Sequence, residues 1–100
     1  MNHAKSLTDE AIVLLKDAII HVLRNARESG HADETDADGN AYIKATNIGK
    51  EMGTYMRSTP PCHSLGRIHR LILDMLWDEG RVEPLCSESD RKIGWRLTDD

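Results

Sequence analysis

The chain has little of what many small folds rely on. It has no Phe, and aromatic residues make up 4% of its 100 residues, so its core must consist mainly of Leu, Ile, Val and Met. Its two cysteines, Cys62 and Cys86, form no C-x-x-C pair, which argues against a zinc ribbon or a redox motif, and we expect two reduced thiols. Its longest apolar run, residues 11–15, is far shorter than the roughly 20 residues of a membrane span.

A secretory signal is missing as well. The first residues lead into a charged amphipathic pattern rather than an apolar segment, so we expect a cytoplasmic protein that enters no membrane. The length predicts a single domain over residues 1–100, with an N-terminal tail at residues 1–6. Hydrophobic residues at 39% and charged residues at 30% are typical of a globular fold.

Positive charge is scarce overall but is concentrated in one segment. The net charge is −4, which argues against a protein that coats nucleic acid through overall positive charge. Residues 41–72 nevertheless hold five basic residues against Glu51 alone, and both flanking segments are acidic. Two histidines, His63 and His69, lie in the same segment. We therefore expect a polyanion to meet the protein there.

The spacing of the apolar residues predicts a long first helix. Residues 6–9 have the S-x-x-D form of a helix start, and apolar residues then recur every three or four positions. We expect a helix over residues 7–29 that ends at Gly30. Residues 31–40 show no periodicity and predict an exposed acidic loop, and residues 41–45 predict a short strand.

Two shorter helices and a hairpin are predicted to follow. Thr46 is the expected N-cap of a second helix, and Ser64 is the expected N-cap of a third helix over residues 64–79. The third helix is closed by a glycine, and residues 81–85 and 92–97 then read as two short strands joined by a turn. The predicted order is therefore helix, short strand, helix, helix, strand, strand.

The third helix and the last strand contribute much of the expected core. The expected core face of the third helix consists of Leu65, Ile68, Ile72, Met75 and Leu76. Trp95 alternates with Ile93 and Leu97 and is expected to be buried. Trp77 falls off the main apolar face of its helix, so we expect it to pack against the first helix or a partner subunit.

Three segments of the chain carry a family resemblance. Residues 46–53 look like the first helix of a helix-turn-helix motif, residues 71–83 look like a recognition helix running into a wing, and residues 91–98 look like the returning wing strand. Over residues 7–98 the chain thus resembles the winged helix-turn-helix domains of prokaryotic transcription regulators. It departs from them before Ser64, where the connection is longer and carries two prolines. The resemblance implies an α+β fold of three helices, a short strand and a C-terminal β-hairpin wing.

The resemblance also implies a function. It implies sequence-specific binding of double-stranded DNA by a small transcriptional regulator, with the helix over residues 64–79 in the major groove. Arg67 and Arg70 are the expected principal contacts, because cations near a helix N-terminus oppose the helix dipole and favour an anionic partner. The simpler interpretation is that Arg70 pairs with Asp74 and that Arg67 is a surface charge. The further candidate contacts are His63, Ser64, Lys44, Lys50, Arg57, Ser58, Arg81, Lys92 and Arg96.

Self-association is a second expectation. Val13, Leu14 and Ile20 lie beside the main apolar stripe of the first helix, so its apolar surface exceeds what one small core can cover. A homodimer would also suit a palindromic DNA site. The acidic turn at residues 87–90 is poor chemistry for a wing that enters a minor groove, so only the basic stems of the wing are expected to contribute.

Other functions receive less support from the residues. No arrangement typical of a catalytic centre, a metal site or a cofactor site is visible, so we expect no enzyme, no metal and no cofactor. Residues 36–43 resemble the start of a calcium loop, but Ala41 and Asn47 stand where glycine and glutamate are needed. The main alternative is a winged-helix module for protein–protein interaction without DNA binding. The net negative charge and the acidic first helix favour it.

Overall fold

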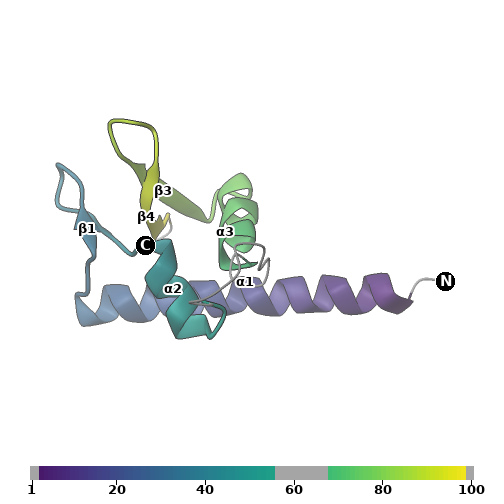
Figure 1. Ribbon diagram of the computed structural model, residues 1–100. Helices are drawn as coiled ribbons and strands as arrows, with labels where there is room; N and C mark the ends of the chain where they lie inside the picture. The colour runs from purple at the N-terminus through teal and green to yellow at the C-terminus, as the bar shows by residue number, and fades with distance from the viewer. Residues whose placement is uncertain (1–2, 56–67, 99–100) are drawn as a thin grey trace.

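The fold is an α+β arrangement, seen in a computed structural model that describes residues 3–55 and 68–98. Its elements are α1 (His3–Ser29), β1 (Glu34–Thr35), β2 (Ala41–Tyr42), α2 (Ala45–Met52), α3 (Ile68–Asp78), β3 (Val82–Cys86) and β4 (Lys92–Leu97). Helix α1 forms a long base, α3 and both hairpins rise from one side of it, and α2 crosses it (Figure 1). Within the described ranges, the helices lack the combination of length and apolar character that crossing a bilayer requires.

Helix α1 begins earlier than the sequence predicts. It starts at His3, so residues 3–6 are helical rather than part of a tail. Lys5 forms an ion pair with Asp9 one turn further along, at 2.8 Å, and such a pair supports an additional helical turn. The predicted end is confirmed, because Gly30 adopts a left-handed φ of 74° directly after the helix.

The segment predicted as an acidic loop contains a small hairpin. Strands β1 and β2 pair with each other, and Asp36 organises the turn between them. Its carboxylate accepts hydrogen bonds from the side-chain amide and backbone N–H of Asn40, from the hydroxyl of Tyr42 and from the backbone N–H of Asp38. These bonds, led by the Asn40 amide, lower the pKa of Asp36 to about 2. In the described ranges no three metal-ligating side chains come together, so this turn is held by the chain's own donors.

Helix α2 is shifted from its predicted bounds. Lys44, not Thr46, is its N-cap, because Asp33 accepts a hydrogen bond from the backbone N–H of Lys44 at 2.9 Å and another from the side chain of Asn47 at 2.8 Å. The helix ends at Gly53, whose φ of 78° makes it a C-cap rather than an interior glycine. It therefore stops before the two prolines of the following connection.

The core lies between the three helices and the hairpin of β3 and β4. Its buried apolar side chains are Ile19, Ile20, Leu23, Ile43, Ile48, Ile72, Leu73, Leu76, Val82, Trp95 and Leu97. The burial of Trp95 is confirmed, with 4% of its surface exposed. Ile20 is a core residue, so it does not contribute to the exposed surface predicted for self-association.

The buried face of α3 differs from the predicted face by part of a turn. Leu73 is fully buried and Met75 is 38% exposed, whereas the opposite was expected. The reason is that α3 contacts α1, α2 and β3 at once, so the arc facing the core includes Leu73 and also His69. Gly80 ends the third helix as predicted, with a φ of 76°. Leu65 lies outside the described residues.

The two hairpins are joined at one point. Strands β3 and β4 pair antiparallel, from Val82 opposite Leu97 onward, and Ile43 forms a single bridge to Trp95. Gly94 permits this approach, because a Cβ there would lie 2.7 Å from the Cβ of Tyr42. The predicted strands at the C-terminal end are thus confirmed to within a residue. The three helices and the terminal hairpin form a layout compatible with a winged-helix-like arrangement.

A histidine fills the contact between α2 and α3. His69 is 1% exposed, its Nδ1 lies 3.1 Å from the hydroxyl of Thr54, and its ring lies against Gly49. Burial, together with the charge of neighbouring Arg70, lowers the pKa of His69. His69 lies in the basic segment of the sequence, but in the fold it is a buried core residue.

This burial predicts that acid destabilises the protein. The pKa of His69 is lower in the folded chain than in the unfolded chain, so the unfolded chain takes up the proton first. The contribution of His69 to the free energy of unfolding is therefore fully present above the pKa of the unfolded chain, about 6.5, and it is lost as the pH drops below that value. Urea unfolding of the wild type should show a lower midpoint at about pH 5.5 than at about pH 7.5.

A substitution at a second histidine, His21, serves as the matched control for His69. His69→Gln should remove this component of the pH dependence, whereas His21→Gln, at an exposed position of α1, should keep it. Identical pH profiles for the wild type and His69→Gln would show that His69 is not the responsible group.

Candidate nucleic-acid interface

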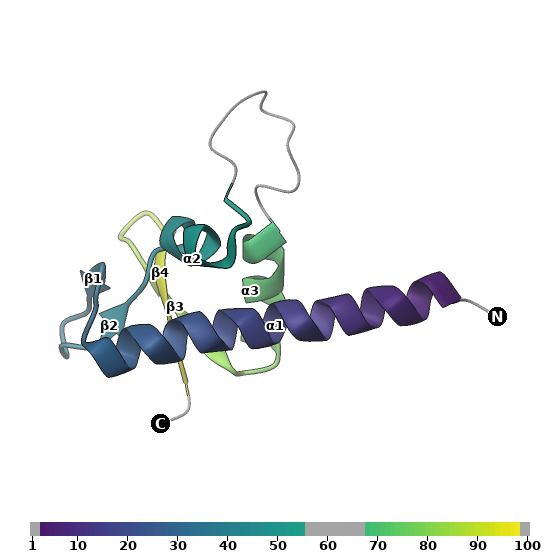
Figure 2. The same cartoon turned by 90° about the horizontal axis from the view of Figure 1, so that it is seen from below.

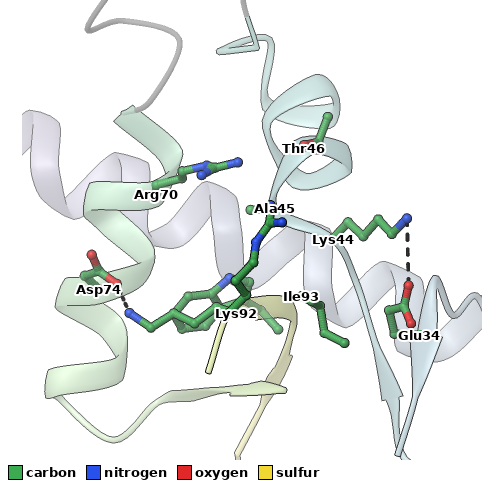
Figure 3. Close-up of a pocket in the computed structure, with 10 residues that line it drawn as sticks. Glu34, Lys44, Ala45, Thr46, Arg70, Asp74, Lys92 and Ile93 are labelled. Atoms are coloured by element: carbon green, nitrogen blue, oxygen red, sulfur yellow. Dashed lines mark hydrogen bonds and ion pairs between the residues drawn. The ribbon is translucent and has the colours of Figure 1, made fainter. Parts of the chain in front are cut away.

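A basic groove lies between α3, the start of α2 and the start of β4. It encloses about 500 Å³, and it is lined by Glu34, Lys44, Ala45, Thr46, Arg70, Asp74, Arg91, Lys92, Ile93 and Trp95. Four of these side chains are cationic and two are carboxylates. Figure 3 shows that the labelled residues come from α2 and its N-cap, from α3 and from both hairpins, which are far apart in the sequence. We call this set of residues the basic groove.

The two lysines of the basic groove are each matched by a carboxylate. Lys44 Nζ lies 3.7 Å from Glu34 on β1, and Lys92 Nζ lies 3.4 Å from Asp74 on α3. Figure 3 shows these two ion pairs at opposite edges of the groove. All four side chains are partly exposed, so both pairs are weak and can exchange for another anion.

The two arginines differ from the lysines. Among the described residues, neither Arg70 nor Arg91 has an ion-pair partner. The pair of Arg70 with Asp74, which was the simpler interpretation of their spacing, is not formed, and Asp74 pairs with Lys92 instead. Arg70 points into the space between α3 and α2 (Figure 3). The excess positive charge of the groove therefore comes from two guanidinium groups.

A pair of tryptophans anchors the hairpin to α3 beside the basic groove. Trp77 and Trp95 meet edge to face with their ring centroids 6.0 Å apart, and the ammonium of Lys92 lies 4.6 Å from the centroid of Trp77. Trp77 thus packs against Trp95 of β4, a contact that the sequence did not predict. This contact holds the start of β4, and with it Arg91, against the helix that carries Arg70. Trp77 and Trp95 are the protein's two tryptophans, so their fluorescence reports on the groove.

Three other residues predicted to bind DNA lie outside the basic groove. Arg96 forms an ion pair with Glu83, lies over a tyrosine ring and lines a separate groove near the C-terminal end of α1. Arg81 lies 3.7 Å from Glu79 at the far end of α3. Lys50 lines a third groove, between α1 and α2. The structure therefore does not bring these three cations together with Arg70.

The remaining predicted contacts fall outside residues 3–55 and 68–98. They are Arg57, Ser58, His63, Ser64 and Arg67. The predicted thiol state can be judged for one cysteine only: Cys86 is free and exposed, and Cys62 lies outside the described residues.

Arg91 is the groove residue that sequence reasoning missed. The prediction placed it in the turn before the last strand and counted only the strand's own cations. The turn is tight, with Asp90 at a left-handed φ of 63° and the backbone N–H of Ser87 donating to the carbonyl of Arg91 at 2.7 Å. This geometry sets Arg91 at the start of the strand. The adjacent Arg91 and Lys92 were the available signal in the sequence.

The start of α2 forms part of the groove wall, and Thr46 lines the groove from its first turn. The Asp33 carboxylate accepts from the backbone N–H of Lys44 at 2.9 Å and offsets the partial positive charge of this helix end. The positive charge of the groove therefore comes from its side chains. Chemically, the basic groove is therefore suited to binding anions, and the planar fork of a guanidinium group matches the oxygens of a phosphate.

Comparisons with protein-family models, with curated proteins and with solved structures found no match for this chain.

Proposed function

We propose that the protein binds double-stranded DNA through the basic groove and α3 and acts as a small, sequence-specific transcription regulator. The observation that carries this proposal is the meeting of Arg70 and Arg91, without ion-pair partners among the described residues, in a chain whose net charge is −4. Two guanidinium groups without ion-pair partners among the described residues, in one groove of an acidic protein, favour the binding of an anion there. Phosphate contacts of this kind set the position of a protein on DNA.

The fold supports the same proposal. Helix α3 follows α2 and leads directly into the terminal hairpin, as in the winged helix-turn-helix domains that the sequence resembles (Figure 1). In helix-turn-helix proteins the second helix of the motif reads base edges and neighbouring residues hold the phosphates. We assign the phosphate contacts to Arg70, Arg91, Lys44 and Lys92. Arg67 as a principal contact, with Ser64 and His63 as further contacts, stays a prediction.

Selection of bound duplexes from a random pool, followed by gel shifts at two salt concentrations, tests the proposal. Each neutralised phosphate contributes about −0.9 to the slope of log affinity against log salt, so two to four contacts predict a slope of roughly −2 to −4. A consensus sequence should emerge from the selection. Failure of the chain to retain any duplex at low salt would contradict the proposal.

We also propose that α1 joins two copies of the protein. The N-terminal half of α1 runs past α3, as Figure 1 and Figure 2 show. The residues Ala4, Leu7, Ala11, Leu14 and Ala18 recur along it at alternating steps of three and four, which is the spacing of a coiled-coil seam. Leu7 is 52% exposed and Leu14 is 68% exposed. A second copy of the same helix has the matching spacing, and a two-fold dimer suits a palindromic DNA site.

Replacing Leu14 with glutamate should therefore yield monomers. Sedimentation at micromolar concentration should show a dimer for the wild type and a monomer for Leu14→Glu. The variant dissociates because the new charge in the seam would be desolvated without a partner. Val13→Glu is the matched control. Val13 was also expected to belong to the self-association surface, but it is 55% exposed and lies off this seam, about 100° around the helix from Leu14. A wild-type protein that sediments as a monomer would refute the dimer.

The exposed apolar residues of α1 also favour a second candidate function, a protein–protein interaction module without DNA binding. Salt separates the two functions, because only DNA binding predicts a steep loss of affinity with ionic strength. For the interaction module, charge reversal on α1, such as Asp17→Lys, should abolish complex formation with the partner protein, and duplex DNA should not be retained.

A further inference from the structure

We infer that the basic groove is also a binding site for a compact oligophosphate, an anion with at least two linked phosphoryl groups. This inference concerns a small ligand and does not require that the protein bind DNA. Its basis is the shape of the groove, the arrangement of its charges and the nature of its walls.

The shape of the basic groove suits a small anion. A hollow of about 500 Å³ lies within the range of pockets that hold small molecules, roughly 300–1,000 Å³. Helices α2 and α3 and the terminal hairpin each supply part of its wall. An anion in such a hollow is contacted from several sides at once, whereas the backbone of a duplex meets mainly the rim.

The charges of the basic groove favour a ligand with more than one phosphoryl group. The carboxylates of Glu34 and Asp74 match Lys44 and Lys92, and this leaves the charge of two guanidinium groups without a counterpart among the described residues. A single phosphate or a sulfate supplies one compact anionic group. Two linked phosphoryl groups supply one for each guanidinium, and each can accept a two-pronged hydrogen-bonded contact.

The lysines of the groove can reinforce the binding. Lys44 is 53% exposed and Lys92 is 38% exposed, and their ion pairs are 3.7 Å and 3.4 Å long. Pairs of this kind are weak and are readily exchanged for a phosphate oxygen. The apolar wall of Ile93 and the buried ring of Trp95 limits the access of water from one side, which strengthens charge interactions in the groove.

Titration of the full chain with inorganic tripolyphosphate tests the inference. Tryptophan fluorescence is the readout, because Lys92 lies over the ring of Trp77 and moves if it binds a phosphate. We expect saturable one-to-one binding, and no saturation with sulfate at the same ionic strength. Calorimetry should report the same stoichiometry.

Charge-matched variants locate the site. Arg70→Gln and Arg91→Gln should each weaken tripolyphosphate binding about tenfold, as expected for the loss of one charge-assisted contact. Arg24→Gln removes the same charge from α1 outside the groove and should leave binding unchanged. Arg91→Gln lies in the hairpin turn, so it keeps the test valid if the variant in α3 fails to fold. Equal losses in all three variants, or no saturable binding by the wild type, would overturn the inference.

Two further titrations identify the source of the phosphates and separate this inference from the proposed function. Equal affinity for ATP and tripolyphosphate indicates that the phosphate chain is the ligand, and tighter binding of ATP indicates a nucleotide. Binding of tripolyphosphate without binding of duplex DNA would support the inference and contradict the DNA proposal. If both bind, tripolyphosphate should displace the duplex; simultaneous, independent binding of both would overturn the assignment to this groove.

Discussion

Gly49→Ala should lower the stability of the protein by about 2 kcal/mol, although alanine is the better helix former. A Cβ at position 49 would lie 2.6 Å from Cε1, 2.7 Å from Nδ1 and 2.9 Å from Nε2 of His69. The ring is buried and bonded to Thr54, so it cannot move aside freely. Overpacking of this kind costs up to about 3 kcal/mol, and the gain in helix propensity returns about 1 kcal/mol. For a domain of this size the melting temperature should fall by roughly 10 °C.

A double-mutant cycle checks the cause of this loss. In a His69→Ala background the ring is absent, so Gly49→Ala should no longer destabilise the protein and should show the gain expected from helix propensity. Thermal melts of the four proteins give the coupling energy. A loss of the same size in both backgrounds would mean that contact between α2 and α3 through His69 is not what requires glycine at position 49.

Loss of both groove arginines should abolish most DNA binding. Arg70→Gln and Arg91→Gln should each reduce affinity for duplex DNA roughly tenfold at low salt, and the double variant roughly a hundredfold. The salt slope should fall by about 1 for each variant, because each arginine neutralises one phosphate. Gel shifts at several salt concentrations measure both quantities.

Arg81→Gln is the matched control for these variants. Arg81 was also predicted to bind DNA, but it lies at the far end of α3 beside Glu79. Its replacement should change affinity less than twofold. A loss as large as that of Arg70→Gln would show that duplex DNA covers a different face of the protein.

Much of the order of elements could be predicted from the sequence, because it depends on local signals. The glycines after α1 and α3 end those helices, and the alternation in the last strand buries Trp95. These features depend on residues close together in the chain, and their physical rules act over a few positions. The start of α2 was predicted wrongly because it depends on a more distant residue: Asp33 sets it from the preceding hairpin.

The site was harder to predict for the same reason. The alternative pairing of Arg70 with Asp74 considered α3 alone, whereas Lys92 from β4 pairs with this carboxylate. Arg91 joins the site only because the hairpin packs its tryptophan against α3. His69 is buried because α2 has a glycine opposite it, which no local pattern reveals. Charge counting identified a basic segment, but tertiary packing determines which of its cations share a groove.

Arginine footprinting tests most directly whether duplex DNA binds at the basic groove. The protein is treated with phenylglyoxal, which modifies guanidinium groups, with and without a saturating duplex, and the modified peptides are quantified by mass spectrometry. Protection of Arg70 and Arg91, with unchanged reaction of Arg24 and Arg81, is the predicted result. Equal reaction of Arg70 and Arg91 in the free protein and in a demonstrated complex would contradict the account.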